Sequence, residues 1–193
     1  MRSVSGSIVT IRPLTAGELT RVEEIDVSEQ DDVVFVQRGR EIVETTERWA
    51  RPRRDADGWM PLIGYWRPAL EAGGVALGAF VGERLVGVAV LRVRLTRDTA
   101  QLAALFVDRE HRRRGVAAAL VDEVERLARV DEARFLYVSA TPSRSAVGFY
   151  RSRGFEPVAE PHPELFELEP DDVHMIEPLS TTVVPPRGVG PAG

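Results

Sequence analysis

The sequence predicts a single α/β domain, and three observations carry that prediction. The chain has 193 residues, of which 44% are hydrophobic, enough for one core of ordinary domain size with little room for a second. Segments rich in β-forming residues alternate with segments of helical periodicity along most of the chain. Residues 102–121 run from an almost wholly apolar strand, through an arginine-rich turn and Gly115, into an amphipathic helix.

The N-terminal segment is predicted to form a strand followed by a helix. Residues 7–13 (SIVTIRP) alternate weakly between apolar and polar side chains, which is typical of a strand. Thr15, with Glu18 three residues later, forms a capping-box pattern. A helix should therefore begin there and end near Ile25.

The next region is predicted to contain a hairpin, a loop and a helix. Two β-rich runs between Asp31 and Glu47 are separated by residues 38–40 (RGR), which favours a hairpin. Residues 50–58 are polar and include a proline, as expected of a loop. Residues 59–70 place apolar side chains at helical spacing, so they predict a helix whose apolar stripe packs in the core or lines a pocket.

The middle of the chain predicts three consecutive antiparallel strands. Residues 75–81 and 85–95 are apolar runs joined by Gly82-Glu83, a dipeptide that suits a tight turn with positive φ at the glycine. Residues 101–107 (QLAALFV) are almost wholly apolar and should form a central strand.

The last third of the chain is predicted to alternate between helix and strand. The helix after Gly115 carries its apolar side chains along one side and should cover one face of the sheet. A strand is expected over residues 134–139. Thr141-Pro142 supplies an N-cap and a first-turn proline for a helix that ends at Gly154.

The C-terminal residues are predicted to be extended or irregular. Extended structure resumes over residues 155–159, and an acidic loop with prolines covers residues 161–170. A closing strand is expected over residues 173–179. Residues 180–193 are rich in proline and glycine and almost uncharged, so we expect a flexible C-terminal tail.

Composition limits the chemistry and the partners of the protein. The chain has no cysteine, which excludes disulfides, thiolate metal sites and an acyl-cysteine intermediate. A net charge of -5 argues against nucleic-acid binding and favours a small or cationic partner. No run of 18 apolar residues exists, and the N-terminus lacks a signal-peptide core. We therefore expect a cytoplasmic protein with no membrane partner.

The turn before the helix that follows Gly115 predicts an anion site. A glycine at a helix start lets several free backbone N–H groups, and the positive end of the helix dipole, face one anion. His111 and three consecutive arginines precede Gly115. Such a run of charged residues usually forms a solvated turn. The glycine and the helix favour a bound pyrophosphate instead.

Two motifs resemble those of a known family. Residues 112–117 (RRRGVA) fit the R/Q-x-x-G-x-G/A signature of the GNAT superfamily of acetyl-CoA-dependent N-acetyltransferases. Residues 143–155, with Ser143, Ala146, Phe149-Tyr150 and Gly154-Phe155, resemble its second signature, in which asparagine often stands at the serine position. The resemblance covers residues 75–158. It implies one GNAT-type domain over residues 1–179, with a mixed central sheet of about seven strands flanked by helices on both faces.

The resemblance also implies a site for acetyl-CoA and none for a metal. The turn and the helix start would bind the pyrophosphate. The end of the central strand would splay from the next strand, and the pantetheine arm would pair with it in the opening. The second signature would complete the site. The implied cofactor-binding residues are Leu105, Phe106, Val107, Arg112, Arg113, Arg114, Gly115, Val116, Ala117, Ala118, Ser143 and Tyr150.

The implied reaction is direct transfer of acetyl from acetyl-CoA to an amine. The backbone N–H of Val107 or Phe106 would bind the developing oxyanion. Tyr150 would protonate the departing thiolate, because a phenol is still protonated at neutral pH. Outside the family match, Tyr150 would instead be a packing aromatic.

The general base is not identified by the sequence. Many GNAT enzymes carry a glutamate where this chain has Gln101, which cannot accept a proton at physiological pH. Four carboxylates of the variable N-terminal half are candidates, although such residues usually lie on the solvated surface. They are Glu24, Asp26, Glu29 and Glu47. His111 is interpreted as a turn residue.

The leading hypothesis is an N-acetyltransferase that acts on a primary amine of a small molecule or protein. An aromatic wall around the acceptor could come from Trp49, Trp59, Tyr65 and Trp66, although such helical stripes are more often core. The alternative is a catalytically silent acyl-CoA-binding sensor, and a nucleic-acid-binding role for the arginines of residues 51–54 and 112–114 is a distant third. A homodimer is also possible, since GNAT relatives often form dimers.

Overall fold

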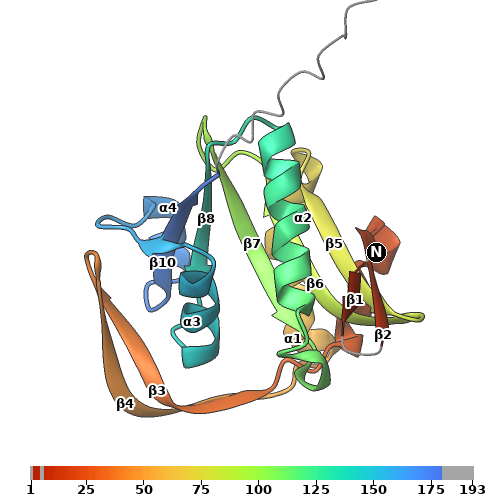
Figure 1. The fold of residues 1–193 in the computed structure, drawn as a ribbon, viewed down its shortest axis with the longest axis horizontal. Coiled ribbons are helices and arrows are strands. Elements are labelled where there is room, and N and C mark those ends of the chain that lie inside the picture. The colour runs from red at the N-terminus through yellow and green to blue at the C-terminus, as the bar shows by residue number, and fades with distance from the viewer. Residues whose placement is uncertain (1, 5–6, 180–193) are drawn as a thin grey trace, which may run out of the picture.

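The structure, a computed structural model, describes residues 2–4 and 7–179. Its centre is one mixed sheet whose described strands are β1 (Arg2–Val4), β2 (Ser7–Pro13), β5 (Val75–Val81), β6 (Arg84–Arg92), β7 (Thr99–Val107), β8 (Phe135–Ala140), β9 (Glu156–Pro157) and β10 (Val173–Pro178). These eight strands lie in the order β1-β2-β5-β6-β7-β8-β10-β9 (Figure 1). Because β1 and β9 span only three and two residues, the predicted sheet of about seven strands is confirmed.

Helices cover both faces of this sheet, as predicted. One face carries α2 (Val116–Val130) and α3 (Arg144–Ser152), and the other carries the 3₁₀ helix η1 (Ala16–Glu24), α1 (Ala56–Glu71) and α4 (Pro163–Leu168). Strand β8 shows how the faces are separated. Leu136 and Val138 join the core under α2 and α3, whereas Tyr137 packs with Leu165 of α4.

Helix α2 lies unusually close to the sheet because of a glycine in β6. Its buried side chains include Val116 and Leu120. A Cβ atom at Gly87 would come within 3.1 Å of the Leu120 side chain and 3.2 Å of the Val116 side chain. The absence of that atom lets the first turn of α2 rest on β6, which fixes where the helix begins relative to the sheet.

The sheet opens between β7 and β8. These two parallel strands pair only at Thr99 with Phe135, Ala100 with Leu136, and Gln101 with Tyr137. By contrast, β6 follows β7 as far as the pair Gly87 and Val107. The last six residues of β7 are therefore unpaired on the β8 side, and the splay expected between these strands is confirmed.

The predicted hairpin exists, but it is longer than expected and forms a sheet of its own. Strands β3 (Glu29–Arg38) and β4 (Glu41–Arg51) form a separate two-stranded sheet that curves beneath α3 and β10 (Figure 1). The Phe35 amide donates to the Pro142 carbonyl at 2.9 Å. The Gln37 side chain accepts from the His174 amide at 2.7 Å and donates to the Val158 carbonyl at 2.8 Å.

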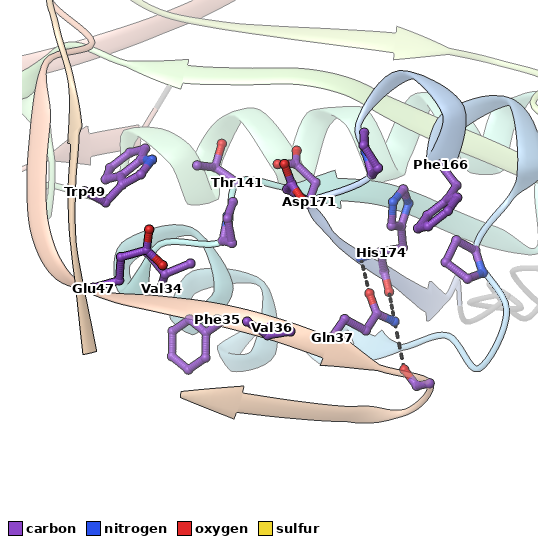
Figure 2. A pocket seen from close by; sticks show the side chains of 15 residues that line it. Val34, Phe35, Val36, Gln37, Glu47, Trp49, Thr141, Phe166, Asp171 and His174 are labelled. Carbon is purple, nitrogen blue, oxygen red and sulfur yellow. Dashed lines mark hydrogen bonds between the residues drawn. The ribbon is translucent and has the colours of Figure 1, made fainter. Parts of the chain in front are cut away.

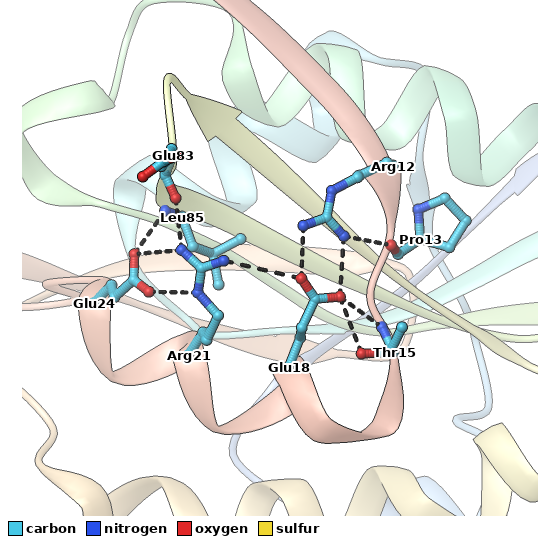
Figure 3. Close-up of polar contacts among 8 residues, drawn as sticks. All are labelled: Arg12, Pro13, Thr15, Glu18, Arg21, Glu24, Glu83 and Leu85. Atoms are coloured by element: carbon cyan, nitrogen blue, oxygen red, sulfur yellow. Dashed lines mark hydrogen bonds and ion pairs between the residues drawn. The ribbon is translucent and has the colours of Figure 1, made fainter.

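The capping box at the first helix is confirmed. The Thr15 amide donates to Glu18 Oε2 at 3.0 Å, and the same carboxylate forms a bidentate pair with Arg12 (Figure 3). At the other end of η1, the Leu85 amide donates to Glu24 Oε2 at 2.8 Å, as Figure 3 also shows. The expected helix is present and is of the 3₁₀ type.

Three local predictions were wrong. Helix α3 is capped by Ser143 rather than Thr141, because the Ser143 hydroxyl accepts from the Ala146 amide at 3.3 Å. Helix α1 begins at Ala56, where Asp55 accepts from the Gly58 amide at 3.0 Å, so the preceding loop is shorter than predicted. The acidic loop contains α4, which begins at a proline. The expected tail, 180–193, lies outside the described residues.

Candidate cofactor and acceptor site

The start of α2 presents backbone N–H groups with no partner inside the helix. Gly115 is the N-cap and has φ 81°, a left-handed conformation that favours glycine. The first intrahelical bond runs from the Ala119 amide to the Gly115 carbonyl, so the amides of residues 116–118 precede it. A glycine cap has no side-chain acceptor, and the first turn carries no acidic residue. This geometry fits an anion such as a diphosphate.

The three arginines before Gly115 are not equivalent. The Arg112 Nε atom donates to the Val107 carbonyl at 3.3 Å, and its Nη1 atom lies 3.7 Å from Glu29. Arg113 and Arg114 are exposed, and neither forms an ion pair with a carboxylate in the described part of the chain. Arg113 also has a positive φ of 60°, which contributes to the sharp turn. Arg112 is thus tied to the strand end, whereas the other two extend into solvent.

The end of β7 directs alternate amides into the gap. The Asp108 amide donates to the Val86 carbonyl at 2.9 Å, which fixes the phase of the ladder with β6. Because bonding alternates along an antiparallel pair, the Phe106 amide faces β6, and the amides of Leu105 and Val107 face β8. The Val107 carbonyl points the same way, as its bond from Arg112 requires. Between the two oxyanion donors expected from the sequence, this geometry favours Val107.

Asp108 anchors the end of this strand and is fully buried. Its carboxylate accepts from the Asp26 amide, the Glu110 amide and Arg84, each at 3.0 Å, and contacts His111 Nδ1 at 3.0 Å. Burial alone would raise the pKa of Asp108, but the hydrogen bonds from His111 and the two amides lower it. His111 is therefore part of the turn, as expected.

Tyr150 lies on α3 and is almost completely buried, with 6% of its surface exposed. Its ring packs edge-to-face against Phe149 and Phe155, with centroids 5.3 Å apart in each case. Burial, and then the negative charge of Asp172, raise the pKa of the phenol. Tyr150 consequently keeps its proton throughout the neutral pH range.

Arg51 lies beside the gap between β7 and β8, and the sequence did not identify it as a residue of the site. Its Nη2 atom lies 3.4 Å from the Thr141 hydroxyl, directly after β8, and 3.7 Å from Glu29. Its guanidinium also lies 5.9 Å from the Phe106 ring of β7 and 5.3 Å from the Trp49 ring. Burial lowers the pKa of Arg51. Contacts on both diverging strands place this cation at the gap.

Glu29 completes this polar cluster. It pairs with Arg51 and Arg112 and accepts a hydrogen bond from the Ser145 hydroxyl. Ser145 in turn contacts Ser143, the buried N-cap of α3, at 3.2 Å. Glu29 therefore holds the hairpin against both the arginine turn and the start of α3.

A cavity of about 660 Å³ lies between the hairpin and the segment that precedes β10. Glu47 and Trp49 of the hairpin face it from one side, and Asp171, Phe166 and His174 from the other (Figure 2). The remaining lining residues are Val34, Phe35, Val36, Gln37, Gly39, Thr141, Pro142, Pro161, Pro170 and Asp172. The cavity reaches the C-terminal end of β8 at Thr141, which also contacts Arg51.

The expected aromatic wall is mostly core. Trp49 lines the cavity. Trp59 and Trp66 are buried beneath the sheet, where their rings pack on Phe106 at 5.2 and 6.3 Å. Tyr65 borders a different depression, between α1 and residues 92–94. The helical spacing of Trp59, Tyr65 and Trp66 in the sequence could not show whether their side chains reach a cavity or pack in the core.

Three of the four candidate bases are engaged elsewhere. Glu24 accepts from Arg21 and the Leu85 amide, Asp26 accepts from the Ser28 amide, and Glu29 holds the arginines. Of these four described carboxylates, Glu47 is the one that lines the cavity. Sequence reasoning missed Asp172. The signal was an Asp-Asp pair directly before an apolar closing strand.

A parallel strand pair that opens beside a glycine-led, arginine-rich helix start defines a coenzyme A-dependent acyltransferase. Residues 39–155, more than half of the chain, match the model of the Acetyltransferase (GNAT) family. The chain therefore belongs to the GNAT family, as its two motifs predicted. It is an acetyl-CoA-dependent N-acetyltransferase, and enzymes of this family need no metal.

Solved structures share the fold. Nourseothricin acetyltransferase superposes with a TM-score of 0.69 at 19% identity, covering 89% of this chain and 99% of that one. The ribosomal-protein-S18-alanine N-acetyltransferase from Escherichia coli gives 0.59 at 15% identity, with 90% and 96% covered. PaiA N-acetyltransferase from Thermoplasma acidophilum, in complex with coenzyme A, gives 0.56 at 15% identity, with 89% and 99% covered. A search of the curated proteins found no match.

The described residues contain neither a helix that could span a membrane nor a cluster of metal-ligating side chains. None of their helices is long and apolar enough to cross a membrane. No group of three or more histidine, aspartate or glutamate side chains among them is placed to hold a metal ion.

Proposed function

We propose that this protein transfers acetyl directly from acetyl-CoA to a primary amine, with both substrates bound together. The observation that carries the proposal is the opening between β7 and β8. It lies beside the start of α2, and the cavity under the hairpin reaches the end of β8 at Thr141. Two substrates could therefore meet in the gap from separate binding surfaces. The chain also has no cysteine through which a two-step transfer could pass.

The residues at the arginine turn fit the diphosphate of acetyl-CoA. The amides of residues 115–118 would donate to it, and Arg112, Arg113 and Arg114 would add charge-assisted bonds. The amides of Leu105 and Val107 would pair with the pantetheine arm in the gap. Ser143 would border that arm, although its hydroxyl already accepts from the Ala146 amide.

Two groups of the chain would act on the acetyl thioester that acetyl-CoA supplies when bound. The Val107 amide would stabilise the negative charge that develops on the carbonyl oxygen, a contribution of about 3 to 4 kcal/mol for one donor. Tyr150 would donate its proton to the sulfur as the C–S bond breaks. The raised pKa of Tyr150 keeps that proton available at neutral pH.

The cavity suits a cationic acceptor. Its lining includes three carboxylates, Glu47, Asp171 and Asp172, together with the aromatic rings of Trp49 and Phe166. Carboxylates and aromatic faces both attract an ammonium group. A volume of about 660 Å³ falls within the range of small-molecule sites, so we propose a small-molecule amine, with a protein amine as the second possibility.

The test is release of the CoA thiol from acetyl-CoA over a panel of amines. We expect turnover with at least one small cationic amine. Tyr150→Phe should lower kcat by about 10²-fold or more while acetyl-CoA still raises the melting temperature. Stabilisation by acetyl-CoA without turnover of any small amine or peptide would instead support the silent sensor. Turnover of peptides alone would move the acceptor assignment to a protein amine.

A further inference from the structure

Asp172 lies where the cavity reaches the end of β8. It is the residue before β10, whose pairing with β8 begins at Val173 and Ala140. Thr141 follows Ala140, so Asp172 and Thr141 leave that strand pair at the same end. Both residues line the cavity, and Thr141 also contacts Arg51. Asp172 is thus the cavity carboxylate that lies at the end of β8, beside Thr141.

The surroundings of Asp172 differ from those of the other carboxylates of the cavity. Glu47 and Asp171 are exposed, whereas Asp172 is partly buried. Burial, and then the negative charges of Glu169 and Asp171, raise the pKa of Asp172 to about 7, and the positive charge of Arg51 limits the rise. A base is most effective when its pKa lies near the working pH.

Other ionisable groups near the site complete this setting. Tyr150 on α3 is influenced by the charge of Asp172. His174 lines the same cavity from β10, and its burial lowers its pKa, which favours the neutral imidazole. The His174 Nε2 atom lies 3.1 Å from the Glu169 carbonyl, so this ring is held at the cavity wall.

We infer that Asp172 is the general base that removes a proton from the acceptor ammonium. This inference rests on the proposed function and adds the residue that prepares the nucleophile. The role belongs to a residue of the segment between α4 and β10, although many GNAT enzymes carry a glutamate at the position of Gln101.

The proton balance closes with Asp172 and Tyr150. One proton of the acceptor ammonium first passes to the Asp172 carboxylate, which keeps it until the transfer is complete and then returns it to solvent through the open cavity. The nitrogen lone pair then attacks the thioester carbon, so that a C–N bond forms and the C–S bond breaks. Tyr150 gives its proton to sulfur and regains one from the acylated nitrogen. One acetyl group is transferred and one proton is released overall.

The two groups assist each other electrostatically. The negative charge of Asp172 raises the pKa of Tyr150. When Asp172 takes up a proton, this charge disappears and the pKa of Tyr150 falls. The phenol therefore becomes a stronger acid at the stage when sulfur needs its proton.

The experiment compares Asp172→Asn with Asp171→Asn. Asp171 is an exposed neighbour that lines the same cavity, and its substitution removes the same charge. The measured quantity is kcat/KM against pH, with the best acceptor of the amine panel. For the wild type we expect kcat/KM to fall below a pH of about 7. Asp172→Asn should lower kcat by about 10²- to 10⁴-fold and remove this dependence. Asp171→Asn should keep the dependence and move it to lower pH, because a negative charge that raises the pKa of Asp172 is removed.

A series of acceptors with decreasing amine pKa separates a base from a substrate-binding residue. An amine that is already neutral at the assay pH needs no base before attack. The defect of Asp172→Asn should therefore shrink along the series. An increase in KM alone, or an equal defect with every amine, would show that Asp172 only binds the acceptor and would overturn the inference.

Control measurements keep the two proposals apart. A wild type that binds acetyl-CoA but turns over no amine contradicts the proposed function. A wild type that turns over, together with an Asp172→Asn variant of unchanged pH profile, contradicts only the role of Asp172. Stabilisation of the variant by acetyl-CoA shows that it is folded. If Asp172→Asn does not fold, Asp172→Glu should have lower activity but retain the acidic limb, that is, the fall of kcat/KM at low pH. Loss of this limb in Asp172→Glu would contradict the inference.

Discussion

The guanidinium of Arg112 donates to the backbone carbonyl of Val107 across 3.3 Å. This bond joins the turn before α2, which would hold the diphosphate of acetyl-CoA, to the end of β7, which would hold its acetyl thioester. The spacing between the proposed diphosphate site and the proposed oxyanion donor is thereby set by two residues that are five positions apart.

Replacing this arginine should affect binding and catalysis together. Arg112→Gln should weaken acetyl-CoA binding by roughly 10- to 100-fold, because one charge-assisted bond contributes about 1.5–3 kcal/mol. It should also lower kcat, because the Val107 carbonyl loses its partner. Arg113→Gln is the matched control, since Arg113 is exposed and should change affinity alone. Calorimetric titration and steady-state kinetics measure both, and an unchanged kcat in Arg112→Gln would contradict the coupling.

Gly115 should be intolerant of a side chain. Gly115→Ala places a Cβ atom on a residue with φ 81°, a conformation that costs an alanine roughly 1 kcal/mol. The added carbon also stands where the diphosphate would approach. We therefore expect weaker acetyl-CoA binding together with a lower melting temperature. Gly64→Ala in α1 is the control, because nothing lies within 4 Å of its added carbon and alanine favours a helix. That variant should be at least as stable as the wild type.

Arg51 should tune the pH dependence of the reaction. Its positive charge favours the ionised form of Asp172 and so lowers the pKa of that carboxyl group. In Arg51→Gln the pKa of Asp172 should rise, and the acidic limb of kcat/KM should move to higher pH. Arg126→Gln, an exposed arginine of α2 paired with Glu123, should leave the limb in place. A limb that moves to lower pH in Arg51→Gln would contradict this arrangement.

Asp108 should stabilise the folded protein except in acid. Its folded-state pKa lies below the ordinary value of 3.8, so its contribution is fully present above that pH. The contribution is lost as the pH falls through the lowered value. Asp108→Asn should decrease the free energy of unfolding by about 1–3 kcal/mol at neutral pH, because buried donors lose their acceptor. Urea unfolding at neutral and acidic pH measures this, and the difference between variant and wild type should narrow in acid.

Local signals in the sequence were sufficient for most of the fold and for the proposed cofactor site. The strands over residues 7–13 and 75–81 have the predicted bounds. Gly115 caps α2 as expected. These features depend on interactions between residues a few positions apart, such as turn geometry, capping and side-chain alternation, and short stretches of sequence record them directly.

The acceptor side depended on contacts between distant segments. The sequence suggested the 31–47 hairpin, but not that Phe35 bonds to Pro142 or that Gln37 bonds to His174. Arg51 and Asp172 are separated by 121 positions, and no periodicity connects them. Their role depends on burial and on the charges brought beside them, which arise only when the hairpin closes over the end of β8. Residue types and spacing thus specified the elements and the anion site, whereas only the packed chain decided which carboxylate lies in the cavity, because the dielectric and charge environment of a side chain is a property of the tertiary structure.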